Sequence, residues 1–223
     1  MSEYVSPIVT VDGVIFQIID TQLCVLLIRR QAEPFKGELS LVGGYNSAGE
    51  TTTTCLERVL HRKAGLTKHQ LKLIEQLYTF DTVARDPRGH AVSVTYMGLG
   101  KDIVPEASDT TQSPEFYPVN ELPELAYDHG DIIRYARERL AAKITYTNAI
   151  FGLLDQFFTL TQLQTAYEAI FGYELDKRNF RKKFLSLDLV RETDEYQREG
   201  AHRPARLYTF KKQALDTLSR SFE

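Results

Sequence analysis

Apolar residues in the first half of the chain form short runs that turn residues separate. The runs are rich in Val and Ile and predict β-strands over residues 7–19, 22–29, 39–42, 71–81 and 90–99. Asp20-Thr21 is expected to join the first two strands as a tight turn, and Gly43-Gly44 to end the third. The acidic stretch 101–125 contains four prolines and is expected to be mostly loop.

Two segments of the same half repeat their apolar residues at helical spacing. The first covers residues 56–63, with a threonine run at 51–54 before it and Gly65 after it, the residue types that cap a helix at its two ends. The second covers residues 128–143. Five strands with two helices predict an α+β domain over residues 1–143.

The pattern changes after Lys143. Helices are predicted over residues 146–158, 161–171 and 177–187, strands over 189–193 and 206–210, and a short closing helix over 211–221. Thr159 followed by Gln162 is a capping-box pattern that opens the second of these helices. Three helices followed by a two-stranded ribbon is the order of a winged helix-turn-helix, which we predict for residues 144–223.

Composition and charge restrict the class of protein. Of the 223 residues, 43% are hydrophobic and 26% charged, as in ordinary globular proteins. No apolar run reaches the length of a membrane span, the first residues do not resemble a secretory signal, and Cys24 and Cys55 are too few for a disulfide framework. We therefore expect a reduced, cytoplasmic protein that does not contact membranes.

The net charge of −3 alone argues against a nucleic-acid binder. Residues 1–143, however, contain 15 basic and 19 acidic residues, whereas residues 177–212 contain 11 basic and 5 acidic residues. The acidic first domain therefore hides a local basic surface in the second. Such a surface suits a DNA-binding module, and the alternative is a solvated basic face.

The segment from Gly44 to Leu66 resembles the Nudix box. Gly44 is followed after five residues by Glu50 and after seven more by Arg58, and Gly65-Leu66 closes the segment as in that family. In Nudix hydrolases, glutamates at spacing i, i+3 and i+4 hold Mg²⁺ against a diphosphate; the matching positions here are Val59, Arg62 and Lys63. The resemblance thus implies the fold, an α/β/α sandwich with a mixed sheet, but no bound metal, no cofactor and no catalytic residues.

The box leaves two interpretations of its cations open. Arg62 and Lys63 either bind a diphosphate directly or are solvent-facing residues near the C-terminus of a helix, where cations suit the helix dipole. Glu50 and Arg58 are expected to form a structural pair. The Nudix resemblance implies an effector site made by Arg30, Phe35, Lys36, Arg62, Lys63, Tyr78, Arg85, Arg88 and His129. In the alternative, Arg85 or Arg88 is a plain turn residue and His129 only follows a helix-capping Asp128.

The basic window carries the predicted DNA contacts. Asp176 precedes a helix whose Phe180 and Phe184 would face a core, which leaves its cations and an amide on the opposite side. Arg and Asn are the side chains that pair with guanine and adenine in the major groove. The predicted contact residues are Lys177, Arg178, Asn179, Arg181 and Lys182 on this helix and His202, Arg203 and Arg206 in the wing.

The chain resembles the Nudix-related transcriptional regulators over nearly its whole length. This resemblance rests on the segments YDHGDII, FTLTQLQTAYEAIFGYELDKRNFRKK and RPARLYTF. That resemblance implies a homodimeric repressor of NAD-metabolism genes that releases its double-stranded operator when ADP-ribose or a related nucleotide binds the first domain. Two alternatives stay open: a sugar-responsive regulator of carbohydrate genes with the same architecture, and an active Nudix pyrophosphatase.

Overall fold

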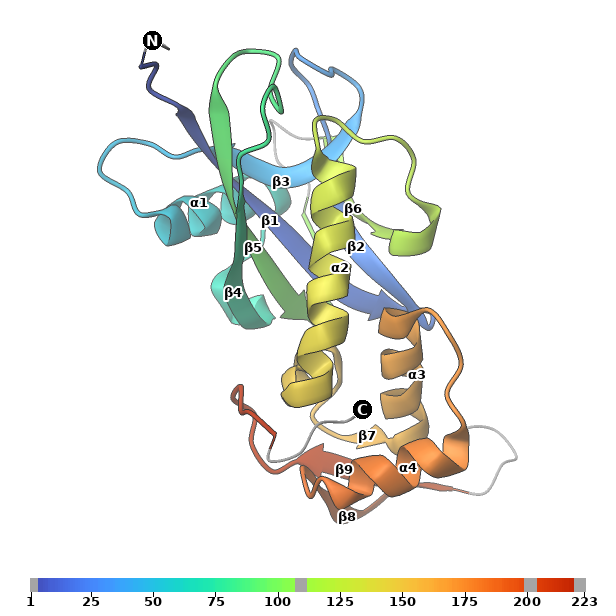
Figure 1. Ribbon diagram of the computed structural model, residues 1–223. Coiled ribbons are helices and arrows are strands. Elements are labelled where there is room, and N and C mark those ends of the chain that lie inside the picture. The colour runs from blue at the N-terminus through green and yellow to red at the C-terminus, as the bar shows by residue number, and fades with distance from the viewer. Residues whose placement is uncertain (1–3, 107–111, 199–203, 219–223) are drawn as a thin grey trace. The chain divides into compact units, whose positions relative to one another are not determined.

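A computed structural model describes residues 4–106, 112–198 and 204–218 (Figure 1). The chain divides into two compact units. The first contains Met1–Gln17 and Cys24–Ala136, and the second contains Ile18–Leu23 and Arg137–Glu223. The division falls within helix α2 (His129–Tyr146) and not after it. No helix in the described ranges combines the length and the apolar composition that a membrane crossing requires.

A six-stranded mixed sheet forms the centre of the first unit. Its strands are β1 (Ile8–Ile19), β2 (Gln22–Arg29), β3 (Leu39–Tyr45), β4 (Leu71–Phe80), β5 (Ala91–Gly100) and β6 (Gln112–Pro118). Their order is β4-β5-β1-β3-β2-β6. Strand β1 runs parallel to β5 and antiparallel to β3, so the middle of the sheet contains both kinds of ladder.

Helices cover both faces of this sheet (Figure 1). Helix α1 (Thr52–Ala64) begins at the cap residue Thr51, whose hydroxyl accepts the Thr54 N–H, and ends at Gly65 in the left-handed conformation. Its buried residues join Val11 and Ile15 of β1 in one apolar cluster. The first turns of helix α2 (His129–Tyr146), with Ile132 and Ile133 buried, lie on the other face. The predicted α/β/α sandwich is confirmed.

The structure corrects one sequence prediction for this unit and adds an unpredicted strand to another segment. Strand β3 does not end at Gly43-Gly44 but continues to Tyr45, because both glycines pair with β1 through their backbone groups. The stretch predicted as mostly loop contains strand β6 and a 3-10 turn, η2 (Val119–Glu121). Strand β6 is at the edge of the sheet, where prolines do not interrupt an inner ladder. A second 3-10 turn, η1 (Lys68–Gln70), precedes β4.

The second unit has the order of a winged helix-turn-helix. It contains η3 (Ala149–Leu153), β7 (Phe158–Thr159), α3 (Leu160–Phe171), α4 (Lys177–Ser186), β8 (Val190–Gln197) and β9 (Ala205–Phe210). The strands form a sheet in the order β7-β9-β8. The Tyr167 ring on α3 contacts the rings of Phe180 and Phe184 on α4, with centroids 5.3 and 6.0 Å apart, and so fixes α4 against α3.

Two predictions for the second unit also need correction. Residues 146–158, predicted as a helix, contain only the last residue of α2, the 3-10 turn η3 and the start of β7, which adds a third strand to the ribbon. Residues 211–218 contain no helix within the described ranges. The Asn148 side chain bonds backbone groups of Lys212, Ala214 and Asp216, so Asn148 supplies partners that an α-helix would supply internally.

Candidate functional site

A cavity of about 490 Å³ opens in the first unit, beside the carboxyl end of β3. Residues of β1, β2, β3 and α1 line it, together with the loops that precede β5 and α2. Seven of the lining residues are Lys or Arg and three are Asp or Glu, so the cavity is cationic. Its size and charge suit a small anionic ligand.

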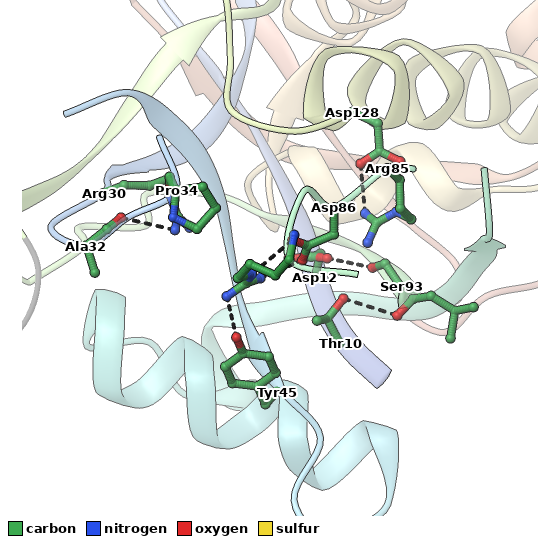
Figure 2. Close-up of polar contacts among 12 residues, drawn as sticks. Thr10, Asp12, Arg30, Ala32, Pro34, Tyr45, Arg85, Asp86, Ser93 and Asp128 are labelled. Atoms are coloured by element: carbon green, nitrogen blue, oxygen red, sulfur yellow. Dashed lines mark hydrogen bonds and ion pairs between the residues drawn. The ribbon is translucent and has the colours of Figure 1, made fainter. Parts of the chain in front are cut away.

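A buried polar cluster lies at the inner end of the cavity. The Lys63 ammonium on α1 donates a hydrogen bond to the carbonyl oxygen of Gly43, at 2.6 Å. The carboxylate of Asp12 on β1 accepts a hydrogen bond from Ser93 at 2.5 Å (Figure 2). A Cβ atom on Gly43 would come within 1.8 Å of Asp12 Oδ1, so this carboxylate requires a glycine beside it.

His129 completes the cluster from the start of α2. Its Nδ1 accepts the Leu41 backbone N–H at 3.0 Å, and its Nε2 lies 3.9 Å from Asp12 Oδ1. Burial lowers the pKa of His129, so the imidazole is neutral at pH 7, with its proton on Nε2 because Nδ1 is an acceptor. Burial also lowers the pKa of Lys63, while the Asp12 carboxylate acts in the opposite direction.

Stacked aromatic and guanidinium groups form a second wall. The Arg30 guanidinium lies 4.8 Å from the centre of the Tyr127 ring, and that of Arg88 lies 5.6 Å from it. Arg88 also pairs with Asp86 and donates to the Tyr45 hydroxyl (Figure 2). These contacts hold two cations and two aromatic rings in place before any ligand arrives.

The predicted structural pair of Glu50 and Arg58 is confirmed, and it joins helix α1 to the loop that precedes it. Arg58 donates to both carboxylate oxygens of Glu50, at 2.5 and 3.0 Å, and to the Tyr45 carbonyl at 2.9 Å. This contact lowers the pKa of Glu50 to about 2. Val59, in contrast, is fully buried in the apolar cluster and does not line the cavity. The described residues contain no group of three His, Cys, Asp or Glu side chains placed to hold a metal ion.

The structure brings together six of the nine residues predicted for the effector site: Arg30, Arg62, Lys63, Arg85, Arg88 and His129. Arg85 is also buried and forms a bidentate ion pair with Asp128 (Figure 2), so neither it nor Arg88 is a plain turn residue.

The other three lie outside the cavity lining. Phe35 packs edge-on against the Tyr127 ring, Lys36 is exposed, and Tyr78 packs with Phe80 and Tyr135. Among the lining residues that the sequence reasoning did not assign to the effector site are Asp12, Tyr45, Asp86 and Tyr127. Only Asp12 carries a signal in the sequence, because it is a carboxylate inside an otherwise apolar strand.

A second candidate site is the outward face of α4. Asp176 caps this helix by accepting the Asn179 N–H at 2.8 Å. Lys177, Arg178, Asn179 and Lys182 are exposed. Arg181 is half-buried instead, and its Nη2 donates to Thr161 Oγ1 of α3 at 2.9 Å.

The predicted wing is described only in part. His202 and Arg203 lie outside the described residues. Arg206 on β9 forms an ion pair with Glu192 and donates to the Tyr196 hydroxyl of β8 at 2.7 Å. Arg206 thus joins the two strands of the ribbon at the base of the wing.

Comparison with known proteins covers both units. Residues 9–136 match the NUDIX domain, and residues 150–210 match the NrtR DNA-binding winged helix domain. The ADPR responsive transcriptional repressor NtrR of Acinetobacter baylyi is 35% identical over 96% of this chain and 86% of its own. The ADP-ribose pyrophosphatase of Methanocaldococcus jannaschii is 36% identical over 59% of this chain and 73% of its own.

Solved structures of Shewanella oneidensis NrtR are similar to both parts of this chain. Its complex with a 27mer DNA superimposes with a TM-score of 0.79 and 31% identity, over 96% of this chain and 99% of that one. Its NUDIX domain in complex with ADP ribose superimposes with a TM-score of 0.56 and 34% identity, over 61% of this chain and 90% of that one. The chain therefore belongs to the NrtR family of transcriptional repressors, in which a winged helix domain follows a NUDIX domain.

Proposed function

We propose that this protein is an ADP-ribose-responsive repressor that binds the nucleotide in the cavity of its first unit without hydrolysing it. One observation carries the proposal. The Lys63 ammonium lies 2.6 Å from the Gly43 carbonyl oxygen, beside the Asp12 carboxylate. A side-chain cation thus contacts a carbonyl oxygen, an oxygen ligand of the kind that a Mg²⁺ ion also prefers.

The cavity supplies what a diphosphate needs. Lys63 and the exposed Arg62 lie on the last turn of α1, and Arg30 and Arg88 line the opposite wall. Guanidinium and ammonium groups bind phosphate oxygens through charge-assisted hydrogen bonds, which are about twice as strong as neutral ones. The half-exposed Tyr45 ring beside Arg88 offers an aromatic surface on which a base can stack.

The same residues argue against turnover. A buried Val59 and the cations Arg62 and Lys63 replace the three carboxylates of the Nudix box, and a hard Mg²⁺ ion binds oxygen ligands. Similarity to an ADP-ribose pyrophosphatase over the first unit supports the same ligand class, not the same reaction. Chemical inactivity suits a sensor, because the effector survives as long as it is bound.

The second unit supplies the output in this proposal. Two copies of the chain form a homodimer in the cytoplasm and place their α4 helices in successive major grooves of an operator, about one helical turn apart. Lys177, Arg178, Asn179 and Lys182 contact DNA from α4, and His202 and Arg203 contact it from the wing. Bound ADP-ribose favours the dimer arrangement with low operator affinity, and the repressed genes serve NAD metabolism.

Two measurements on the full-length protein test the proposal. Incubation with ADP-ribose and Mg²⁺, followed by chromatography of nucleotides, is expected to leave the ADP-ribose intact. Formation of AMP would contradict the proposal that the protein binds this nucleotide without hydrolysing it. A thermal-shift comparison of ADP-ribose with free pentoses is expected to show stabilisation by ADP-ribose alone, since a ligand of the native state raises its stability. Stabilisation by a pentose alone would favour a sugar-responsive regulator.

A further inference from the structure

Helix α4 presents a row of side chains that includes one exposed leucine. Arg178, Lys182 and Leu185 follow at intervals of four and three residues and therefore lie along one side of the helix. Leu185 is 42% exposed, while Phe180 and Phe184 on the opposite side are buried. We call Arg178, Lys182 and Leu185 the outward row.

Aromatic contacts fix the direction in which this row points. The Phe180 ring contacts Tyr167 of α3, and the Phe184 ring contacts both Tyr167 and Phe210 of β9, with centroids 6.0 and 6.4 Å away. Turning α4 about its axis would expose these buried rings to water, which the hydrophobic effect opposes. The outward row is thus held on the free side of the helix.

We propose that Leu185 contacts the 5-methyl group of a thymine in the operator and so specifies one A·T pair in each half-site. The proposal rests on the proposed function, in which α4 enters the major groove. The thymine methyl is the apolar group that the edges of base pairs present in that groove. A leucine that two cations in the same row bring against DNA has this methyl as its chemically matched partner.

The chain offers a matched control for this proposal. Leu215 lies in the same unit and is 43% exposed, close to the exposure of Leu185. It belongs to no helix and lies in the segment after β9. An effect of leucine removal that appears at Leu185 and not at Leu215 therefore reports the position on α4, not a general loss of apolar surface.

The test uses a duplex that the full-length protein selects from a random-sequence library. Each dT of one half-site is then replaced by dU, which removes only the methyl group. For the unchanged protein we expect one position at which dU lowers affinity about fourfold, the equivalent of about 0.8 kcal/mol for one buried methyl. Leu185→Ala should bind the dT and dU duplexes equally, whereas Leu215→Ala should keep the fourfold difference.

The outcomes separate this inference from the proposed function. If dU is neutral at every position for the unchanged protein, or if Leu185→Ala keeps the full difference, the leucine contact is refuted while DNA binding stands. If the library yields no enriched duplex, the proposed DNA-binding function fails and the leucine contact fails with it. The dT to dU replacement needs no protein variant, so the first outcome does not depend on how Leu185→Ala folds.

Discussion

The Nζ atom of Lys63 lies 2.6 Å from the carbonyl oxygen of Gly43, although the two residues are twenty positions apart in the sequence. Helix α1 brings the ammonium to strand β3 at the point where β3 pairs with Asp12 of β1. The Asp12 carboxylate favours the charged form of Lys63, which burial opposes. Burial lowers the pKa of Lys63 overall, and the ammonium lies in the site as part of a covalently attached side chain.

Replacing this ammonium should weaken effector binding. Lys63→Met keeps most of the side-chain volume and removes the charge, and we expect ADP-ribose affinity to fall at least tenfold, since a hydrogen bond to a charged group contributes about 1.5–3 kcal/mol. Isothermal titration calorimetry measures the change, and added Mg²⁺ should not restore binding. The control is Lys68→Met, because Lys68 is exposed and forms a surface ion pair with Glu57, 3.5 Å away. Equal affinities for both variants would remove Lys63 from the effector site.

Gly43, which lies beside the Asp12 carboxylate in the buried polar cluster, should tolerate no side chain. Gly43→Ala would place a Cβ atom 1.8 Å from Asp12 Oδ1 and 2.7 Å from the Val11 carbonyl oxygen. We expect the free energy of unfolding to fall by about 1–3 kcal/mol, the usual cost of forcing extra atoms into a packed interior. Urea denaturation measures this loss.

Gly130 is the matched control for that substitution. A Cβ atom there meets nothing within 4 Å, and the residue lies in helix α2. Gly130→Ala should raise stability by about 0.5–1 kcal/mol, because alanine has the higher helix propensity. A Gly43→Ala variant as stable as the unchanged protein would show that Asp12 moves away at little cost.

How far the sequence predicted the site depends on how local each feature is. The Nudix-like spacing correctly placed the Glu50–Arg58 pair and brought Arg62 and Lys63 to the cavity, because one loop and one helix fix these positions. Tyr127 was missed because its role depends on Arg30 and Arg88, which approach it from other loops. Such contacts arise from the tertiary fold and leave no periodic pattern in the chain.

Errors in the fold prediction have a similar origin. Gly43-Gly44 predicts a break when the sequence is considered alone, yet pairing with β1 keeps both glycines in a strand. The predicted closing helix fails within residues 211–218, where Asn148 binds the backbone of a distant segment. In both places a partner remote in sequence satisfies the backbone and overrides local propensity.

The ion pair between Glu50 and Arg58 should make part of the free energy of unfolding depend on pH. The pKa of Glu50 is about 2 in the folded protein and 4.5 ordinarily, so the folded state favours the carboxylate. Because the folded-state pKa is the lower one, the contribution is fully present above about pH 4.5 and is lost as the pH falls toward 2. Glu50→Gln should lower the melting temperature at pH 7, and its difference from the unchanged protein should shrink between pH 5 and pH 3.

A glutamate without such a pair provides the control for the pH profile. Glu57 forms a surface ion pair with the exposed Lys68 at 3.5 Å, so Glu57→Gln should change the melting temperature little at any pH. A constant difference between Glu50→Gln and the unchanged protein from pH 7 to pH 3 would contradict the proposed role of the pair.

Two arginines of α4 should affect operator binding in different ways. Arg178 is exposed on the outward row, whereas Arg181 is half-buried and donates to Thr161 Oγ1 of α3. Arg178→Ala should weaken binding and reduce the slope of log K against log salt by about 1, because one phosphate contact releases about one counterion. Arg181→Ala should lower the melting temperature and weaken binding with little change in slope, since its role is to hold α4 against α3. Fluorescence anisotropy at several salt concentrations measures both slopes. A lower slope for Arg181→Ala with an unchanged melting temperature would instead make Arg181 a direct DNA contact, and would mean that this side chain leaves Thr161 when DNA binds.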